Sequence, residues 1–357
     1  MTHPVYSPAT ADPAELEAHT VGRADLLDTL TTRIAGAARD GARPHTMLIG
    51  PRGAGKTHTL RLVVHRSLAD PQTAERTLPV LIPEDTLAIG GYLDLLVEIA
   101  RAIGGDTADA ARSMRHDRDA IGIEQAIMSA AAGRMLLLAL ENLDRVFHRL
   151  GRDGQGSLRA WVETSTAITI FATAPALFAG VTSRDFPWYG SFMVETLTDL
   201  TVPEVAELLA HRAPALAAFA ETSEGAARIA DIHTALGGSP RVWQMLADIA
   251  DIPMLRAVTP AVEAVLDRLA PLHQARLWEL PPSEQRLIVE LARAGAPRTV
   301  SDLAAAVGVS NQAAAAVLGR LGESHWVTSH KDCADRRSSW YDLTDPLLRQ
   351  VLRFRDR

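Results

Sequence analysis

Short apolar runs and longer helical segments alternate along the first half of the chain. The apolar runs have the length of strands and are bounded by breakers or charges; they lie at residues 46–50, 78–82, 135–140, 168–171 and 192–194. Helical periodicity fills the stretches between them, near residues 57–69, 91–103, 119–132 and 155–165. This alternation is typical of a mostly parallel sheet covered on both faces. The pattern therefore predicts an α/β fold for residues 21–196.

The strand signal stops near residue 197, and the remaining chain divides into two further units. Residues 197–279 are predicted to be an all-helical unit, with helices at 201–212, 223–236, 240–251 and 255–269. Residues 280–357 carry three amphipathic helices, at 283–292, 299–307 and 311–321, followed by strands at 326–328 and 340–343. That order predicts a winged helix-turn-helix. Residues 1–20 are polar and contain prolines, and they are predicted to be a flexible leader.

Composition narrows the function classes. The 357 residues are 47% hydrophobic, enough for a sizeable core, and the formal net charge of −7 excludes a globally basic nucleic-acid coat. The single cysteine, Cys333, excludes an internal disulfide framework and a multi-cysteine zinc site. No segment reads as a membrane span or a secretory signal, so we expect a cytoplasmic protein without membrane association.

A phosphate-binding loop follows the first apolar run. The segment fits the pattern G-x-x-x-x-G-K-[ST] and comprises Gly50, Pro51, Arg52, Gly53, Ala54, Gly55, Lys56 and Thr57, with His58 next in the helix. Its glycines let backbone N–H groups turn toward a polyphosphate at the start of a helix. Lys56 is expected to reach the β and γ phosphates, and Thr57 to offer its hydroxyl to Mg²⁺. Only two of the 36 basic residues are lysines, so a lysine at position 56 stands out against a strong preference for arginine in this sequence and calls for a chemical reason.

The third apolar run ends in acids, as a nucleotide site of this kind requires. Residues 135–140 are followed by Glu141, Asn142, a leucine and Asp144. Glu141 is our candidate for the carboxylate on the metal side, and Asp144 beyond it favours this register. Asn142 then stands where a glutamate usually polarises the attacking water; an amide orients water but does not take its proton. An alternative register makes Glu141 the catalytic acid. The preferred register predicts slow intrinsic hydrolysis.

With these residues in place, the chain resembles the AAA+ ATPases, closest to the branch of origin-recognition-like and signal-transducing STAND ATPases. The resemblance covers most of residues 21–357 and implies ATP with Mg²⁺ as ligands. Val21, Gly22 and Arg23 resemble the segment that closes over the adenine, and Thr173 resembles the sensor-1 residue. Arg241, in the run Gly-Gly-Ser-Pro-Arg, resembles the sensor-2 arginine of the helical lid. Arg184 is a candidate arginine finger that acts on a neighbouring subunit, or an exposed loop residue.

Positive charge gathers in the last unit. From residue 281 to the end there are 11 Lys plus Arg and 9 Asp plus Glu, a balance of +2 in a chain of net charge −7. Asn311, Gln312 and Arg320 lie on the helix in the recognition position, and Lys331, Arg336 and Arg337 lie in the predicted wing. These six residues are the candidate contacts to duplex DNA. The recognition helix is otherwise rich in alanine, so base-specific contacts are few.

Two functions are consistent with these features. The first is an ATP-dependent switch or loader that acts on duplex DNA, in which nucleotide binding closes the lid. The second is a STAND-like signalling or transcription regulator, in which the winged helix binds protein and ATP holds an assembled or inactive state. Homo-oligomers or partner proteins are compatible with both. A metabolic kinase is a distant third, because it has no use for a sensor-2 lid and a winged helix.

Overall fold

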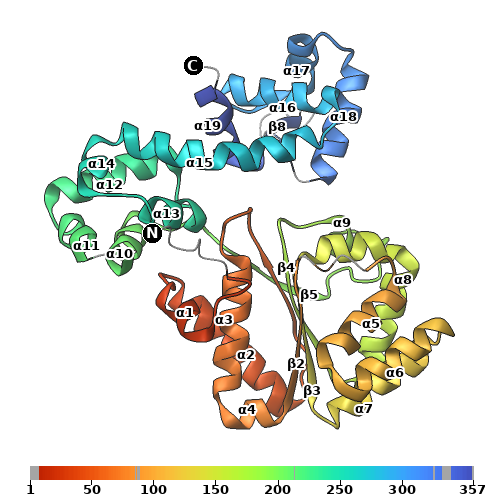
Figure 1. Ribbon diagram of the computed structural model, residues 1–357. Coiled ribbons are helices and arrows are strands. Elements are labelled where there is room, and N and C mark those ends of the chain that lie inside the picture. Colours follow the sequence, from red (N-terminus) through yellow and green to blue (C-terminus); the bar gives the residue numbers. More distant parts are fainter. Residues whose placement is uncertain are drawn as a thin grey trace. The chain divides into compact units, whose positions relative to one another are not determined.

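The computed structural model describes residues 8–84, 86, 89–212, 214–324, 326–331 and 339–355 (Figure 1). The chain divides into two compact units. Within the described residues, the first comprises 8–50 and 55–198, and the second comprises 51–54 and 199–355.

The first unit is built on a five-stranded parallel sheet. Its strands are β1 (His45–Ile49), β2 (Thr77–Ile82), β3 (Met135–Leu140), β4 (Ile168–Ala174) and β5 (Phe192–Thr196), in the spatial order β2-β3-β4-β1-β5. Every neighbouring pair is parallel. All residues of β3 and β4 are buried, which explains why these strands are continuous apolar runs without alternation. The predicted α/β fold with a parallel sheet is confirmed.

Helices cover both faces of this sheet (Figure 1). One face carries α1 (Pro13–Ala18), α2 (Ala24–Asp40), α3 (Lys56–Ala69) and α4 (Pro71–Glu75). The other carries α5 (Tyr92–Ile103), α6 (Gly105–His116), α7 (Ala120–Ala131), α8 (Leu143–Ser165) and α9 (Ala179–Thr182). Successive residues of β3 serve the two cores in turn: Leu137 packs with the α2 and α3 side chains, whereas Leu136 and Leu138 pack with those of α5 and α8.

The N-terminal segment differs from the predicted flexible leader. Residues 13–18 form α1, which Asp12 caps by accepting a hydrogen bond from the Glu15 amide. Leu16 is buried in the core under α2 and α3, and Glu17 forms a two-point ion pair with Arg66 of α3. One apolar side chain in a polar segment is a weak sequence signal, which is why this docked helix escaped prediction.

The second unit contains the helical region and the C-terminal region. The helical region comprises α10 (Val202–Arg212), α11 (Pro214–Ala220), α12 (Ser223–Leu236), α13 (Pro240–Ala247), α14 (Ile252–Ala257) and α15 (Thr259–Trp278). The predicted helix 255–269 is in fact two helices. Val258, with φ of 52°, separates α14 from α15, and α15 continues nine residues past the predicted end, through Pro271.

The C-terminal region has mixed helices and strands. Its helices are α16 (Pro282–Ala294), α17 (Val300–Val307), α18 (Asn311–Glu323) and α19 (Pro346–Arg355). Strands β6 (Arg298–Thr299), β8 (Ser339–Leu343) and β7 (Val327–Lys331) form an antiparallel sheet in that order. A core of leucines from α16, α17 and α18, with Trp326 and Leu343, holds these elements together. None of the helices in the described part of the chain is both long and apolar enough to cross a membrane.

Candidate functional site

The loop after β1 has the geometry of a phosphate cradle. Gly53 and Gly55 both have φ of 88°, which side-chain-bearing residues rarely adopt, so the loop requires glycine at both positions. Lys56 begins α3, and its Nζ donates a 2.7 Å hydrogen bond to the Gly50 carbonyl oxygen at the far end of the loop. The loop therefore presents backbone N–H groups and a lysine at a helix N-terminus, which together suit a polyphosphate.

Glu141 follows β3 at the same edge of the sheet. The Thr57 hydroxyl donates a 3.1 Å hydrogen bond to Glu141 Oε2, and the Glu84 amide also hydrogen-bonds this carboxylate. The side chain is buried, and burial raises the pKa of Glu141 although the Thr57 hydrogen bond opposes the change. Thus Glu141, and not Asn142, lies beside the P-loop threonine. Asp144 lies in the first turn of α8, so strand alternation does not extend to it.

The donor set at this edge fits a magnesium-bound polyphosphate. A carboxylate and a hydroxyl are the hard oxygen ligands that Mg²⁺ takes, and a buried carboxylate gains from a nearby cation. Across the described ranges, no group of three or more His, Cys, Asp or Glu side chains could hold a metal by itself. In phosphate-transfer sites, phosphates and waters supply most of the ligands of Mg²⁺. Thr57 and Glu141 are the residues that would hold it.

Asn142 occupies a strained backbone position. It has φ of 51° and ψ of 57°, in the left-handed region, at the junction between β3 and α8. Asparagine tolerates this region better than most residues with side chains. The backbone N–H of Asn142 donates a 3.1 Å hydrogen bond to the hydroxyl of Thr173, which is buried near the end of β4. The two predicted site residues are therefore in direct contact, and position 142 favours asparagine for a backbone reason that the sequence did not reveal.

The segment Val21-Gly22-Arg23 lies against the same loop. Gly22 and Arg23 both have φ of 61°, and Arg23 caps α2 with this left-handed conformation. The Arg23 guanidinium donates a 2.7 Å hydrogen bond to the carbonyl oxygen of Thr198, just after β5. Its Nη1 also lies 3.0 Å from where a Cβ on Gly55 would stand, so Gly55 must lack a side chain. The segment thus joins the P-loop to the end of the sheet.

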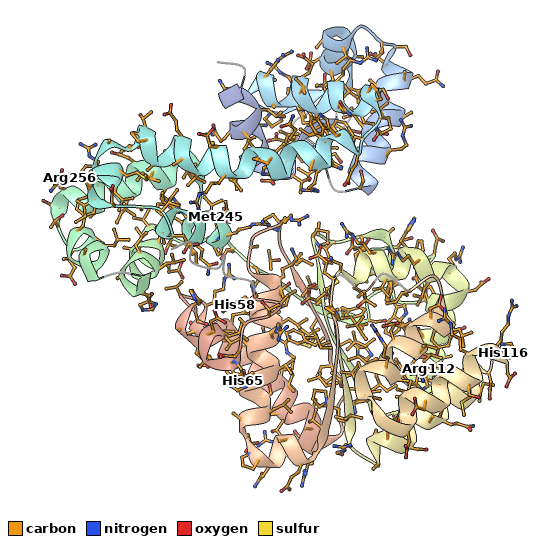
Figure 2. The ribbon with its side chains drawn as sticks, in the orientation of Figure 1. His58, His65, Arg112, His116, Met245 and Arg256 are labelled. Carbon is orange, nitrogen blue, oxygen red and sulfur yellow. The ribbon has the colours of Figure 1, made fainter. Side chains whose placement is uncertain are left out.

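His58, on α3, is turned into protein contacts (Figure 2). Its Nε2 lies 3.0 Å from the Thr20 hydroxyl, in a hydrogen bond that ties α3 to the segment after α1. Burial lowers the pKa of His58 to about 4, and the positive charge of Arg23 acts in the same direction. The imidazole is therefore neutral near pH 7 and serves packing and positioning.

In the second unit, Arg241 lies at the start of α13. Its backbone amide donates a 3.3 Å hydrogen bond to the carbonyl oxygen of Gly53, which belongs to the same unit. Close packing explains the two glycines, Gly237 and Gly238, that precede it. A Cβ on Gly238 would stand 2.1 Å from the Leu200 carbonyl oxygen, and the Trp243 indole N–H donates to Gly237 O at 2.8 Å. The Gly-Gly-Ser-Pro-Arg run is therefore a close contact between α13 and the strand-to-helix connection at Leu200.

Arg184 lies in the exposed loop between α9 and β5. Its guanidinium stands 5.8 Å from the centroid of the Tyr189 ring, which is itself half exposed. Both side chains are open to solvent on the first unit, and neither contacts the P-loop residues through a hydrogen bond or ion pair within the described chain. The position leaves open both interpretations given above.

The predicted DNA contacts fall into three groups. Asn311 and Gln312 lie exposed in the first turn of α18, which Ser310 caps. Arg320, on the same helix, donates a 2.9 Å hydrogen bond through Nε to the carboxylate of Glu284, a side chain that is only 8% exposed. Arg320 therefore stabilises the contact between α16 and α18. The sequence alone does not show this role, because it depends on how the two helices pack. Lys331 ends β7, and Arg336 and Arg337 lie outside the described residues.

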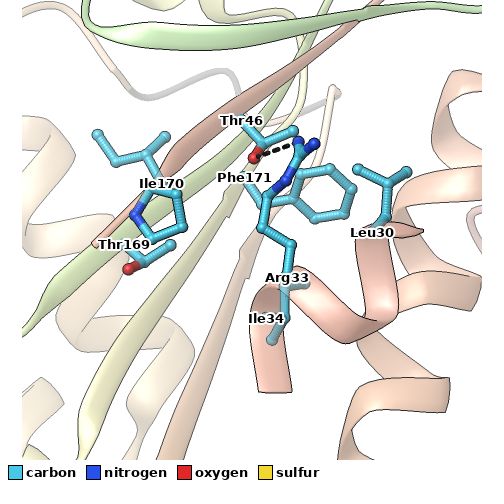
Figure 3. A pocket seen from close by; sticks show the side chains of 8 residues that line it. Leu30, Arg33, Ile34, Thr46, Thr169, Ile170 and Phe171 are labelled. Carbon is cyan, nitrogen blue, oxygen red and sulfur yellow. Dashed lines mark hydrogen bonds between the residues drawn. The ribbon is translucent and has the colours of Figure 1, made fainter. Parts of the chain in front are cut away.

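A small pocket lies at the opposite edge of the sheet (Figure 3). It is lined by side chains of α2 and by the first residues of β1 and β4, among them Arg33, Thr46, Thr169 and Phe171. Arg33 donates a 3.2 Å hydrogen bond to Thr46 and pairs with Glu195 of β5 at 2.7 Å. Because the P-loop follows the last residue of β1, this pocket is remote from the phosphate cradle within the first unit.

Glu84 is the site residue that sequence reasoning missed. It follows β2 by two residues, as Asn142 follows β3, and the two strands pair in register at Ile82 and Leu140. The signal was present: Glu84 is the first acid after a predicted strand, and parallel strands end at a common edge. What could not be foreseen is that β2 pairs with β3.

Known structures identify the fold. No protein-family model matches this chain, and no curated protein matches it. The ORC2 protein of Aeropyrum pernix, solved as ADPNP–ADP complexes, is 15% identical with a TM-score of 0.62, and the match covers 94% of each chain. The ORC1 protein of the same organism, solved in complex with DNA, is 12% identical with a TM-score of 0.51 over 95% of this chain and 94% of that chain.

These two matches define the class first. The chain has the α/β fold of AAA+ P-loop ATPases. Within that class, its fold is similar to those of these two ORC proteins over nearly the full length of each chain.

Proposed function

We propose that this protein is an ATP-binding switch that acts on duplex DNA and hydrolyses ATP slowly by itself. The observation that carries the proposal is the contact between Thr57 and Glu141. It joins the P-loop helix to the acid at the end of β3, in a buried position. Such a pair of hard oxygen donors beside a lysine suits Mg²⁺ with a nucleoside triphosphate.

In this proposal each site residue has one role. The P-loop amides and Lys56 bind the β and γ phosphates, and Thr57 and Glu141 hold Mg²⁺, which would neutralise charge on the phosphates. Arg23 and its neighbours Val21 and Gly22 adjoin the loop and would enclose the base; the preference for ATP over GTP rests on the family resemblance. Thr173 and Arg241 sense the γ phosphate from the sheet and from the helical region, respectively. Arg184 would act as an arginine finger on the nucleotide of a neighbouring subunit.

The slow hydrolysis follows from Asn142. An amide hydrogen-bonds to a water molecule and orients it, but it does not accept the proton. The backbone geometry supports asparagine at this position because it tolerates the left-handed conformation. The combination favours a protein that stays in its ATP state for long periods and changes state when a partner or DNA accelerates turnover.

The DNA part of the proposal rests on the C-terminal region, which we interpret as a winged helix. Its charge balance is +2 within an acidic chain, and three of its eleven basic residues, Lys331, Arg336 and Arg337, lie in the predicted wing. The similar ORC1 protein of Aeropyrum pernix was solved in complex with DNA, which is consistent with this interpretation. Phosphate contacts by the wing would give salt-dependent affinity with little sequence preference.

A second function is favoured by a specific observation on α18. Its exposed residues are Asn311, Gln312, several alanines, Gly319 and Arg320, and the arginine pairs with Glu284. Such a surface offers few contacts to base edges and suits close packing against another helix. The alternative is a STAND-like regulator in which this region binds protein and ATP holds an inactive or assembled state.

One experiment separates the two. ATP turnover by the purified full chain is measured with and without duplex DNA, with Lys56→Ala as the blank. DNA that raises turnover several-fold over the protein alone supports the DNA-linked switch. Turnover that stays low with saturating DNA, while nucleotide binding is intact, argues for the STAND-like regulator. A Lys56→Ala variant that binds ATP as tightly as the wild type contradicts both.

A further inference from the structure

A carboxylate that accepts a proton would speed hydrolysis at this site, and Asn142 does not provide one. Water attack on a γ-phosphate is accelerated when a base accepts the proton, typically by a factor of about 10² to 10⁴. Glu141 is buried beside Thr57 on the metal side, and its carboxylate is engaged there. Position 142, where such a base would stand, carries an amide.

Glu84 supplies a second carboxylate at the same edge. Its backbone amide hydrogen-bonds the Glu141 carboxylate, which in turn accepts from Thr57. The Glu141 carboxylate therefore links the P-loop threonine to the backbone of Glu84. Glu84 and Asn142 each lie two residues beyond a paired strand end, Ile82 of β2 and Leu140 of β3.

The Glu84 side chain is free to change partners. It is 48% exposed, and its ion pair with Arg145, in the first turn of α8, spans 3.9 Å with the arginine 63% exposed. A pair this open and this long holds its partners weakly. Arg145 lies three residues after Asn142, the residue that precedes α8, so the ion pair holds the Glu84 carboxylate at the same end of α8 as Asn142.

We propose that Glu84 is the general base of this ATPase, and that it acts on a water molecule oriented by the Asn142 amide. The inference rests on the proposed ATP-binding function. The water oxygen forms a bond to the γ-phosphorus while its proton passes to a Glu84 carboxylate oxygen. The bond from the γ-phosphorus to the β–γ bridging oxygen breaks, ADP leaves with that electron pair, and Glu84 later returns the proton to solvent.

The two roles are divided between two strand ends: Asn142, two residues after β3, orients the water, and Glu84, two residues after β2, takes the proton. Because the carboxylate comes from the edge strand and is held loosely, only a fraction of molecules place it correctly. Slow but genuine turnover is the expected result.

The test is a panel of full-length variants with two readouts. Affinity for a fluorescent ATP analogue is measured by titration, and hydrolysis is measured under single-turnover conditions with protein in excess. Glu84→Gln should lower turnover by about 100-fold, to the level of the Lys56→Ala blank, while its nucleotide affinity stays within twofold of the wild type. Glu75→Gln, an exposed carboxylate of α4, is the matched control and should change neither quantity.

Arg145→Ala distinguishes a base from a structural partner. If Glu84 acts on water, loss of Arg145 changes turnover by less than about threefold, because the ion pair is weak. A loss as large as that of Glu84→Gln would show that the pair itself matters and overturns the proposal. The proposal also fails if Glu84→Gln hydrolyses ATP as fast as the wild type, if it loses affinity in parallel with turnover, or if the wild type turns over no faster than Lys56→Ala.

The ATP-binding function and the role of Glu84 can each be contradicted by a different result. Nucleotide affinity that Lys56→Ala leaves unchanged contradicts the proposed function itself. Nucleotide affinity that depends on Lys56, together with turnover that is indifferent to Glu84, leaves the ATP-binding function in place and removes only the role of Glu84.

Discussion

The carboxyl edge of the parallel sheet and the exposed face of α18 were both predicted as functional surfaces, and the structure constrains them very differently. At the sheet edge, backbone geometry demands particular residues: Gly53 and Gly55 need positive φ, and Asn142 sits in the left-handed region. On α18, the one charged residue of the predicted face is bound to Glu284. Chemistry can be inferred from sequence where the backbone dictates the residue, and poorly where a side chain has a choice of partners.

The largest expected effect compares the only two lysines of the chain. Lys56→Ala should weaken ATP binding by at least about 100-fold, because Lys56 is the point charge of the phosphate cradle. Lys331→Ala should leave ATP affinity unchanged and weaken duplex DNA binding by a few-fold. Titrations of both ligands against both variants check this. Equal effects of the two substitutions on ATP affinity would break the contrast between the two regions.

A second comparison uses two glycines with positive φ. Gly53→Ala must place a Cβ at φ of 88° and within 2.9 Å of Ser239 Oγ, so ATP affinity should fall about tenfold or more. Gly41→Ala has φ of 74° at the end of α2, with no atom within 4 Å of the new Cβ. It should cost about 1 kcal/mol of unfolding free energy and leave ATP affinity unchanged. Nucleotide titration and chemical denaturation of both variants show whether steric contact at Gly53, or backbone strain alone, lowers ATP affinity.

A third comparison sharpens the interpretation of the C-terminal region. Replacing Arg336 and Arg337 with alanine should reduce the slope of log affinity against log salt by about 2, since each phosphate contact contributes about 0.9. Arg320→Gln should leave that slope unchanged and lower the unfolding free energy by about 1–3 kcal/mol, because it removes a charged hydrogen bond to a nearly buried glutamate. DNA titrations at several salt concentrations test both. If only Arg320→Gln reduced the slope, α18 and not the wing would be the phosphate-binding surface.

The smallest expected effect concerns acid stability of the first unit. Burial lowers the pKa of His45 to about 4, and its Nδ1 accepts a 3.2 Å hydrogen bond from the Ile170 amide. The unfolded chain, with an ordinary histidine pKa near 6.5, binds protons first, so stability is present above that pH and declines as pH falls. Between pH 8 and pH 6 this one group should remove about 0.8 kcal/mol of unfolding free energy.

The measurement for His45 is denaturant unfolding at both pH values. His45→Gln keeps a neutral acceptor on the side chain and should flatten the pH dependence by the same amount. A variant whose pH dependence equals that of the wild type would assign the acid sensitivity to other groups, such as His58.

Much of the fold followed from the sequence, and the reasons are physical. Strands β3 and β4 are buried on both faces, so their apolar runs are unbroken and easily recognised. Helix α6 was missed because polar and charged residues dominate it, with only Ala111 buried, and α1 was missed because Leu16 is its only buried residue. These elements are stabilised by tertiary contacts that leave little periodic signal.

The residues of the P-loop could be predicted from the sequence, whereas the roles of Glu84 and Arg320 could not. The P-loop, Glu141 and Thr173 all lie at the expected edge, and Thr57 meets Glu141. The role of Glu84 depends on β2 being the neighbour of β3, which strand order along the chain does not dictate. The partner of Arg320 likewise depends on the packing of α16 against α18.

The strand order has a consequence for synthesis of the protein. The phosphate loop hangs on β1, and β1 pairs only with β4 and β5, whose residues come more than 120 positions later in the chain. A nascent chain therefore cannot complete the support of the loop until residue 196 has left the ribosome. Such distant pairing is slow and exposes apolar strands meanwhile. Ribosome-bound chains halted before β4 should be unable to retain ATP and should depend on chaperones.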